Sequence, residues 1–282
     1  MTSRPPATGG GRRVDLHTHT RFSDGVLSPE ALVALALERG LDALAITDHD
    51  TVEALPAARA AAGARLELLT GIEISSAEGG QEFHVLGYGL DPDHRPLRER
   101  LERFRAERLS RAEAMVERLR ALGVVVDRDE VVARAGEGVV GRPHLADALV
   151  RAGHADDVDD AFRRFLGNDG AAYVPRPAFR PDEAIELIRA AGGVSVLAHP
   201  GAHLPDRVIE SLAARGLRGI EAWHPQHGGS TVRRYQALAA RLGLLVTGGS
   251  DFHGPDRGMG LGDLPVPWAA LEALKRAVGL AA

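Results

Sequence analysis

The stretch SPEALVALALERGLDALAITDHDT, residues 28–51, contains a helix signal followed at once by a strand signal. Ser28, followed by proline, can cap a helix that ends at Gly40. The apolar run 41–47 then has the length and composition of a buried strand, and it ends in the polar residues 48–50. Helices and strands that alternate in this way predict an α/β fold with parallel strands.

The same alternation recurs along most of the chain. We predict seven strands, at residues 13–16, 41–47, 66–74, 83–90, 194–200, 218–225 and 244–253. The segment 181–193, directly before the fifth strand, is an amphipathic helix by its spacing of apolar residues. Parallel strands joined by right-handed crossovers in this number favour a closed or nearly closed α/β barrel.

The connection between the third and fourth strands departs from this pattern. Only residues 75–81 separate the two strands, which is too few for a crossover helix. We therefore expect this pair to turn back tightly. Such a return would bring His84, near the start of the fourth strand, beside Glu73 at the end of the third.

Residues 92–172 interrupt the alternation with apolar residues at helical spacing among many charges. Shorter helical patterns follow at residues 128–135, 141–151 and 157–166. We expect these residues to form a helical insertion subdomain, a lid, within a barrel domain made of residues 12–91 and 173–282.

The composition narrows the class of protein. The net charge of −5 argues against nonspecific capture of nucleic acid. Because the chain has no cysteine, any metal must be held by nitrogen and oxygen ligands. No apolar run approaches the ~20 residues needed to cross a bilayer, and residues 1–11 are predicted to be a flexible tail rather than a signal peptide. We expect a cytoplasmic protein without a membrane or an obligate protein partner.

Histidines and carboxylates stand at the ends of the predicted strands. They are His17, His19, Asp24, Asp48, His49, Glu73, His84, His199, Asp251 and His253. Strand ends of a parallel barrel open on one rim, so these side chains should converge. In an extended segment the side chains at i and i+2 point to one face, so His17 and His19 can hold the same ion. Ordinary polar strand ends would explain one or two of these residues, whereas the whole set predicts a cluster of divalent first-row metals.

Eight short motifs together resemble a known family. They are DLHTHTRFSDG, LAITDHDT, GIEIS, HVLGYGL, GRPHLADALV, AAYVPR, VLAHP and GSDFHG. They resemble the polymerase-and-histidinol-phosphatase (PHP) superfamily of metal-dependent phosphoesterases, from about residue 13 to residue 254. The most similar branch is that of 3',5'-nucleoside-bisphosphate phosphatases, which also includes 5'-nucleotide phosphatases and a 5'-to-3' RNA exonuclease.

The resemblance implies a distorted seven-stranded (β/α)7 barrel with a helical insertion and up to three metals per chain. Mn²⁺ is the first expectation, and Zn²⁺, Fe²⁺ and Mg²⁺ are alternatives. The implied ligands of the first metal are His17, His19, Glu73 and Asp251. Glu73 would bridge to a second metal, which is completed by His84 and His199. The implied ligands of the third metal are Asp24, His49 and His253. Glu73, His199 and Asp251 are the predicted catalytic residues.

A cluster of this kind predicts hydrolysis of phosphate monoesters by direct attack of a metal-bound hydroxide, and the resemblance implies that the esters are nucleotides. The expected substrate is the 3'-phosphate of a nucleoside 3',5'-bisphosphate, and 5'-nucleotides are also expected. Arg142 and His144 in the insertion could hold the second phosphate of a bisphosphate. The simpler interpretation of these two residues is a helix start with a solvated histidine.

Four further residues have two interpretations each. Asp48 could orient a ligating histidine or cap the next helix. His224 is predicted to contact substrate and His227 is a weaker candidate, although their loop would be polar in any case. Trp223 and Phe252 could stack on a base, but packing at a strand end explains both.

Three other functions are compatible with parts of the pattern. A histidinol phosphatase would use the same metal chemistry, but the TDHDT and GIEIS motifs and the insertion resemble the nucleotide branch. A 5'-to-3' exoribonuclease acting on short RNA would need an open groove for a second nucleotide. A noncatalytic PHP module should have lost metal ligands, whereas here none is missing.

Overall fold

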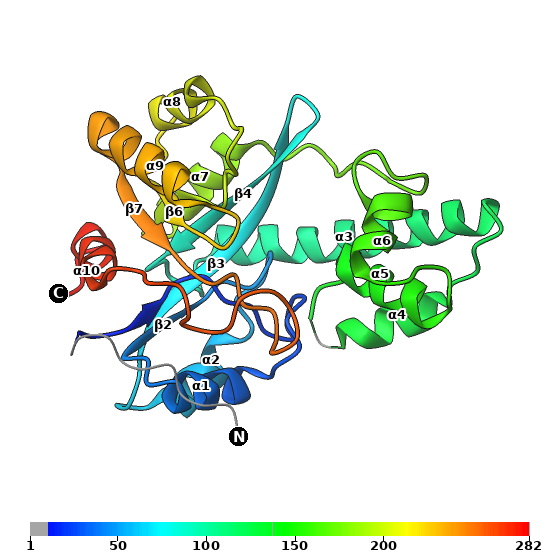
Figure 1. The fold of residues 1–282 in the computed structure, drawn as a ribbon, viewed down its shortest axis with the longest axis horizontal. Helices are drawn as coiled ribbons and strands as arrows, with labels where there is room; N and C mark the ends of the chain where they lie inside the picture. The colour runs from blue at the N-terminus through cyan, green and yellow to red at the C-terminus, as the bar shows by residue number, and fades with distance from the viewer. Residues whose placement is uncertain (1–10, 137, 282) are drawn as a thin grey trace.

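A computed structural model describes residues 11–136 and 138–281. Its strands form one seven-stranded sheet in chain order. They are β1 (Val14–Asp15), β2 (Ala43–Ile46), β3 (Glu67–Glu78), β4 (Gln81–Tyr88), β5 (Val194–Leu197), β6 (Gly219–Trp223) and β7 (Leu245–Gly248). The sheet curls into a nearly closed barrel (Figure 1), which confirms the predicted fold class. The tail predicted for residues 1–11 lies, except for Gly11, outside the described residues.

The strands are not all parallel. β4 runs antiparallel to both β3 and β5, while the other neighbouring pairs are parallel. Gly79 and Gly80 form the turn between β3 and β4, and both have a positive φ that glycine adopts without strain. The predicted tight return is therefore confirmed. Because β4 is reversed, its first half lies where the parallel strands end, and His84 pairs with Ser75.

A short seam joins β1 to the segment after β7. Thr18 and Phe252 form an isolated parallel bridge, and the His19 N–H donates to the Phe252 carbonyl at 2.9 Å. A Cβ atom added to Gly249 would lie 2.3 Å from both the backbone nitrogen and the Cβ of His17. Only glycine allows so close an approach, so Gly249 lets the two ends of the sheet meet.

Helices cover the outside of the sheet and one opening of the barrel. They are α1 (Pro29–Glu38), α2 (Leu55–Ala62), α7 (Pro181–Ala190), α8 (Asp206–Ala214), α9 (Gly229–Leu242) and α10 (Trp268–Ala277). The predicted cap of α1 is confirmed, because the Ser28 hydroxyl accepts from the Ala31 N–H at 3.2 Å. Among the described helices, none is long and apolar enough to span a bilayer.

Alternating residues of β2 serve two apolar cores. Leu44 and Ile46 of β2 belong to the cluster that packs under the outer helices. The intervening Ala43 and Ala45 belong to a second cluster that includes Leu271 of α10. This alternation is the period of two expected for a strand buried on both faces.

The segment that interrupts the barrel is helical, as predicted. It contains α3 (Arg95–Ala121), α4 (Arg128–Ala135), α5 (Arg142–Arg151), α6 (Val158–Ala161) and the π-helical turn η1 (Phe162–Leu166). α3 extends away from the barrel, and α4, α5 and α6 lie along its far part (Figure 1). Leu97 and Phe104 of α3 pack in the barrel core, whereas Met115 and Leu119 pack in a separate core of the insertion. The division of the chain into a barrel domain and a lid stays a prediction.

Candidate metal centre

Glu73 lies fully buried among five histidines. Its Oε1 lies 2.9 Å from His84 Nδ1 and 2.9 Å from His199 Nε2. Its Oε2 lies 3.1–3.3 Å from a ring nitrogen of each of three more histidines, His17, His19 and His49. The predicted approach of His84 to Glu73 is therefore confirmed, and one carboxylate joins side chains from five segments of the chain.

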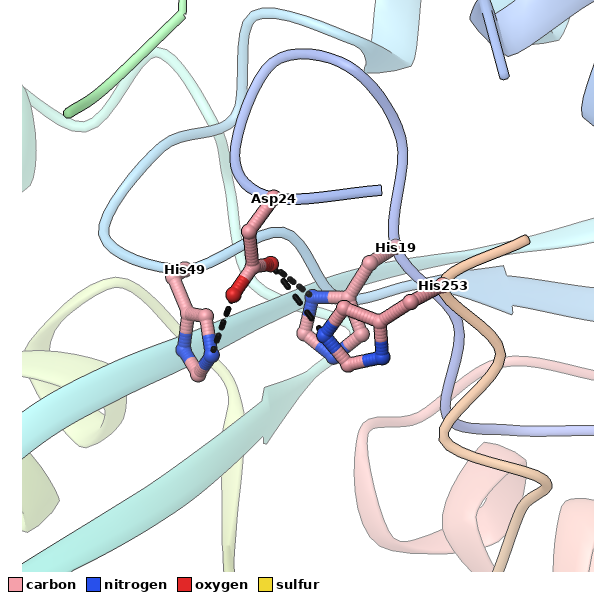
Figure 2. A group of neighbouring side chains, drawn as sticks. All are labelled: His19, Asp24, His49 and His253. Atoms are coloured by element: carbon pink, nitrogen blue, oxygen red, sulfur yellow. Dashed lines mark ion pairs between the residues drawn. The ribbon is translucent and has the colours of Figure 1, made fainter. Parts of the chain in front are cut away.

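Asp24 is a second carboxylate that several histidines surround. Its Oδ1 lies 3.2 Å from His253 Nε2 and 3.7 Å from His19 Nδ1, and its Oδ2 lies 3.7 Å from His49 Nε2. Figure 2 shows the carboxylate pointing between His49 on one side and the His19 and His253 rings on the other. Those two rings stack with their centroids 4.2 Å apart. His19 and His49 thus each face both Asp24 and Glu73.

Asp251 completes the cluster at the seam of the barrel. Its Oδ1 lies 3.1 Å from His19 Nε2 and 3.4 Å from His17 Nε2. Asp50, His199 and Asp251 are the non-glycine residues with positive φ in the described part of the chain, and two of them belong to this cluster while Asp50 follows His49. Such backbone conformations are strained and persist where the surrounding structure fixes a side chain for function.

The structure thus brings all nine predicted metal ligands together. Three overlapping sets have ligand atoms within 4.8 Å of one another: His19, Asp24, His49 and His253; His17, His19 and Glu73; His49, Glu73 and His84. His19 Nε2, Asp24 Oδ1 and His49 Nδ1 are buried and make no hydrogen bond among the described residues, although each has one of the ion-pair contacts given above. Because buried polar atoms normally make hydrogen bonds, these nitrogen and oxygen atoms fit a bound cation.

The charges of the cluster also fit a cation. Burial alone would raise the pKa values of Asp24, Glu73 and Asp251, but the neighbouring histidines hold all three pKa values well below their usual range. Burial would likewise lower the pKa of His253, yet Asp24 and Asp251 raise it to about 10. Burial does lower the pKa of His49, to about 3. The three carboxylates are therefore ionised, which is the form in which they can serve as ligands of divalent cations.

Glu221 supports this cluster and was not predicted from the sequence. It is fully buried; its Oε1 accepts a hydrogen bond from His17 Nδ1 at 2.9 Å, and its Oε2 accepts one from the His199 backbone N–H at 2.8 Å. In the neutral ring this contact fixes the proton on Nδ1, so that Nε2, which faces Glu73, is the nitrogen that can coordinate a cation. The one available signal was a glutamate inside the apolar run 218–225.

Replacing Glu221 with glutamine should lower metal affinity by about 10–100-fold. An amide has a single acceptor oxygen, so it cannot accept from both His17 and the His199 backbone. Titration of Mn²⁺ into metal-stripped protein measures the change. Glu186→Gln is the control, because Glu186 pairs with Arg189 on the exposed face of α7. Equal affinities of the two variants would show that Glu221 does not orient the ligands.

Asp48 plays neither of the two predicted roles. Its carboxylate accepts from the Thr20 N–H at 2.7 Å, the Thr20 hydroxyl at 2.6 Å and the Ser23 hydroxyl at 2.6 Å. The Ser23 hydroxyl in turn lies 3.4 Å from His19 Nδ1. Asp48 therefore holds the loop that carries two of the predicted ligands, and both the direct contact with a ligating histidine and the helix cap are wrong.

Arg142 and His144, predicted to hold a phosphate, both lie in the first turn of α5. Arg142 Nη2 donates to Glu82 Oε2 at 2.6 Å. His144 is buried, and its Nδ1 accepts from the Gly141 N–H at 2.9 Å. The solvated histidine of the simpler interpretation is therefore wrong, although the helix start is present.

A cavity of about 650 Å³ opens beside the cluster and is lined by Asp24, Asp251, His253, His224, Gln226 and Arg257, among others. His224 Nδ1 accepts from the Gln226 N–H, and its Nε2 lies 3.3 Å from Asp251 Oδ2.

His227 instead serves the backbone, because its Nδ1 donates to the Ala222 carbonyl and its Nε2 accepts from the Gly201 N–H. Phe252 is buried in the main core, and Trp223 packs against this core. The predicted role of both side chains in apolar packing is therefore confirmed.

An α/β barrel whose rim gathers buried histidines and carboxylates is typical of metal-dependent hydrolases. Comparison with known proteins identifies the family. Residues 15–124 match the PHP domain. The chain is 35% identical over 256 residues to the 5'-3' exoribonuclease Rnm of Salmonella typhimurium, covering 86% of this chain and 85% of the relative.

Two further similar proteins indicate the same family. The 3',5'-nucleoside bisphosphate phosphatase of Chromobacterium violaceum is 35% identical over 252 residues, which cover 87% of this chain and 88% of the relative. A solved structure from Bifidobacterium adolescentis, described as a metal-dependent phosphoesterase, superposes with a TM-score of 0.88 at 36% identity, covering 97% of both chains. The chain belongs to the PHP family, and it is a metal-dependent phosphoesterase.

Proposed function

We propose that this phosphoesterase removes the 3'-phosphate from nucleoside 3',5'-bisphosphates and also acts on 5'-nucleotides. The observation that carries the proposal is a group of guanidinium groups beside the cluster. Arg142, Arg111 and Arg176 surround Glu82, which precedes the cluster residue His84 by two positions on β4. A bisphosphate needs a cationic site of this kind for its second phosphate, whereas a monophosphate does not.

We also propose that up to three divalent cations bind to the cluster, with Mn²⁺ the first candidate. The residues proposed to hold them are His17, His19, Glu73 and Asp251 for the first, Glu73, His84 and His199 for the second, and Asp24, His49 and His253 for the third. When bound, such cations neutralise the charge of a phosphate ester and lower the pKa of water towards neutrality. Glu73 Oε1 and Oε2 face different histidines, so this carboxylate is suited to join two ions.

Two histidines are suited to orient the substrate. The Gly141 N–H donates to His144 Nδ1, so the neutral ring carries its proton on Nε2 and can donate from there. Burial lowers the pKa of His144 and favours this neutral form. The Gln226 N–H donates to His224 Nδ1 in the same way, which leaves the Nε2 proton beside Asp251 at the wall of the cavity. We propose that both donate hydrogen bonds to phosphate oxygens.

A second candidate activity is 5'-to-3' hydrolysis of short RNA. The cavity of about 650 Å³ exceeds what a single phosphate requires, and Gln226 and Arg257 in its wall could contact a following nucleotide. The similar protein of Salmonella typhimurium is named as such an exoribonuclease. Both activities would use the same cluster.

The test is phosphate release by protein that has been stripped of metal and reloaded with Mn²⁺. The substrates are adenosine 3',5'-bisphosphate, AMP, histidinol phosphate and a short 5'-phosphorylated RNA. We expect the bisphosphate to be preferred, with AMP as its product. Arg142→Ala should raise KM for the bisphosphate by about tenfold or more, because a charge-assisted contact with the second phosphate is lost.

The KM for AMP should change far less in the same variant, and Arg98→Ala, which removes an exposed ion pair of α3 with Glu53, should change neither value. Equal losses on both substrates would exclude Arg142 as the contact to a second phosphate. A preference for histidinol phosphate or RNA would overturn the proposed substrate, and no turnover with any metal would indicate a noncatalytic module.

A further inference from the structure

Four arginines and two carboxylates form a buried cluster between the insertion and the barrel. Glu82 lies 2.6 Å from Arg142 Nη2, 3.2 Å from Arg111 Nη2 and 3.7 Å from Arg176 Nε. Asp50 lies 2.6 Å from Arg108 Nη2 and 3.5 Å from Arg176 Nη1. Four positive charges thus face two negative ones. An excess of buried positive charge is costly without an anion, so this cluster is suited to bind one.

The two carboxylates differ in how firmly they are held. Asp50 is completely buried, accepts the Ser75 N–H at 2.8 Å and has a positive φ. It is therefore a fixed part of the fold. Glu82 has a side chain that is 14% exposed, and the partners given above for its carboxylate are guanidinium groups. Of the two carboxylates, Glu82 is therefore the one that an incoming anion can reach.

Glu82 also borders the proposed reaction site. A cavity of about 250 Å³ is lined by Glu82 together with His84 and His199, which both contact Glu73. Glu82 and His84 are two residues apart on β4 and so share a face of the strand. A substrate whose scissile phosphate lies at the histidines can therefore extend through this cavity to Glu82, whose carboxylate contacts Arg142.

We propose that Glu82 occupies the arginine site as an internal substitute for the substrate's second phosphate, and that it leaves Arg142 when the substrate binds. This inference rests on the proposed function and extends it. A phosphate dianion balances the excess positive charge better than a single carboxylate, and its oxygens match the paired donors of a guanidinium group. Displacing Glu82 lowers the apparent affinity for an anion, because part of the binding free energy is used to move it.

Sulfate binding to the metal-free protein tests this inference without catalysis. Isothermal titration calorimetry should show that Glu82→Gln binds sulfate at least about tenfold more tightly than the wild type, because the competing charge is gone. The double variant Glu82→Gln/Arg142→Ala should lose that gain, which places the sulfate at Arg142. Glu78→Gln is the control: Glu78 lies at the end of β3 and pairs at 2.9 Å with Arg215, which is not one of the four arginines of the cluster.

If Glu82 instead holds the arginines in place permanently, Glu82→Gln will bind sulfate equally or less tightly, and the inference is overturned. If the glutamine variant does not fold, sulfate binding by Glu82→Asp provides a second test. It keeps the charge but shortens the reach to Arg142, so its sulfate affinity should lie between those of the wild type and Glu82→Gln.

The outcomes also separate this inference from the proposed function. If Glu82→Gln binds sulfate more tightly but the Mn²⁺-loaded wild type does not hydrolyse the bisphosphate, the role of Glu82 is supported and the proposed substrate is wrong. If the wild type hydrolyses the bisphosphate but Glu82→Gln does not bind sulfate more tightly, the proposed substrate is supported and the role of Glu82 is wrong.

Discussion

Replacing Glu73 with glutamine should remove most of the bound metal and lower phosphate release by at least about a hundredfold. Glu73 has five histidines within 3.3 Å of its two oxygens, and it has no contact with solvent. The amide keeps the size of the side chain but removes its charge and one acceptor oxygen. Both changes weaken the hold on cations in a buried site.

Metal content per chain, measured by elemental mass spectrometry after dialysis, and phosphate release from one preparation check this prediction. Glu78→Gln, a change of the same type on the same strand, should retain both. Far-UV circular dichroism shows whether the variant is folded. Full metal content with lost activity would mean that Glu73 acts on the reaction rather than holding metal. Full metal content with full activity would exclude both roles.

Replacing Arg108 with leucine should destabilise the protein by about 3–5 kcal/mol, because it leaves a buried charge without its main partner. Arg108 Nε lies 2.7 Å from Asp50 Oδ2, and its Nη2 donates to the Ser75 hydroxyl at 3.0 Å. Both guanidinium and carboxylate are buried, so water does not replace the lost contact. Arg108 is on α3, so these bonds tie the insertion to the barrel.

Urea unfolding followed by circular dichroism measures this change. The matched control is Arg98→Leu on the same helix, whose exposed ion pair with Glu53 should contribute less than ~1 kcal/mol. The double variant Arg108→Leu/Asp50→Asn should recover part of the loss, because asparagine removes the unpaired charge and tolerates the positive φ at this position. Similar effects of Arg98→Leu and Arg108→Leu would show that burial does not distinguish these two contacts.

Much of the fold could be predicted because its signals are local. The predicted strand at 41–47 contains β2, and the helical pattern at 128–135 has the same bounds as α4. Even the reversal of β4 follows from the short connection at 75–81, since a crossover helix needs more chain. The metal cluster could be predicted for a related reason: most of its histidines and carboxylates come after strands, and barrel topology brings strand ends together. Glu73 and His84 instead lie within β3 and β4, because both strands are longer at this edge than predicted.

Contacts between distant segments could not be predicted in this way. Glu221 meets His17 across the barrel, and Asp48 reaches back to Thr20, so neither role has a fixed spacing in the chain. The pairing of Arg142 with Glu82 is of the same kind, because it depends on how the insertion docks. The spacing of apolar residues predicts the helices of the insertion. It does not predict how these helices dock on the barrel, because that contact depends on buried charged residues without a periodic pattern.

The seam at Thr18 and Phe252 has a consequence for how the protein is made. Synthesis proceeds from the N-terminus, so a nascent chain that has reached β5 already contains Glu73 and most of the cluster's histidines. Asp251 and His253 follow only after β7, and the same segment closes the barrel through Phe252. A chain interrupted before that point lacks both a closed sheet and a complete set of ligands. We expect such a chain to retain less metal than the full chain.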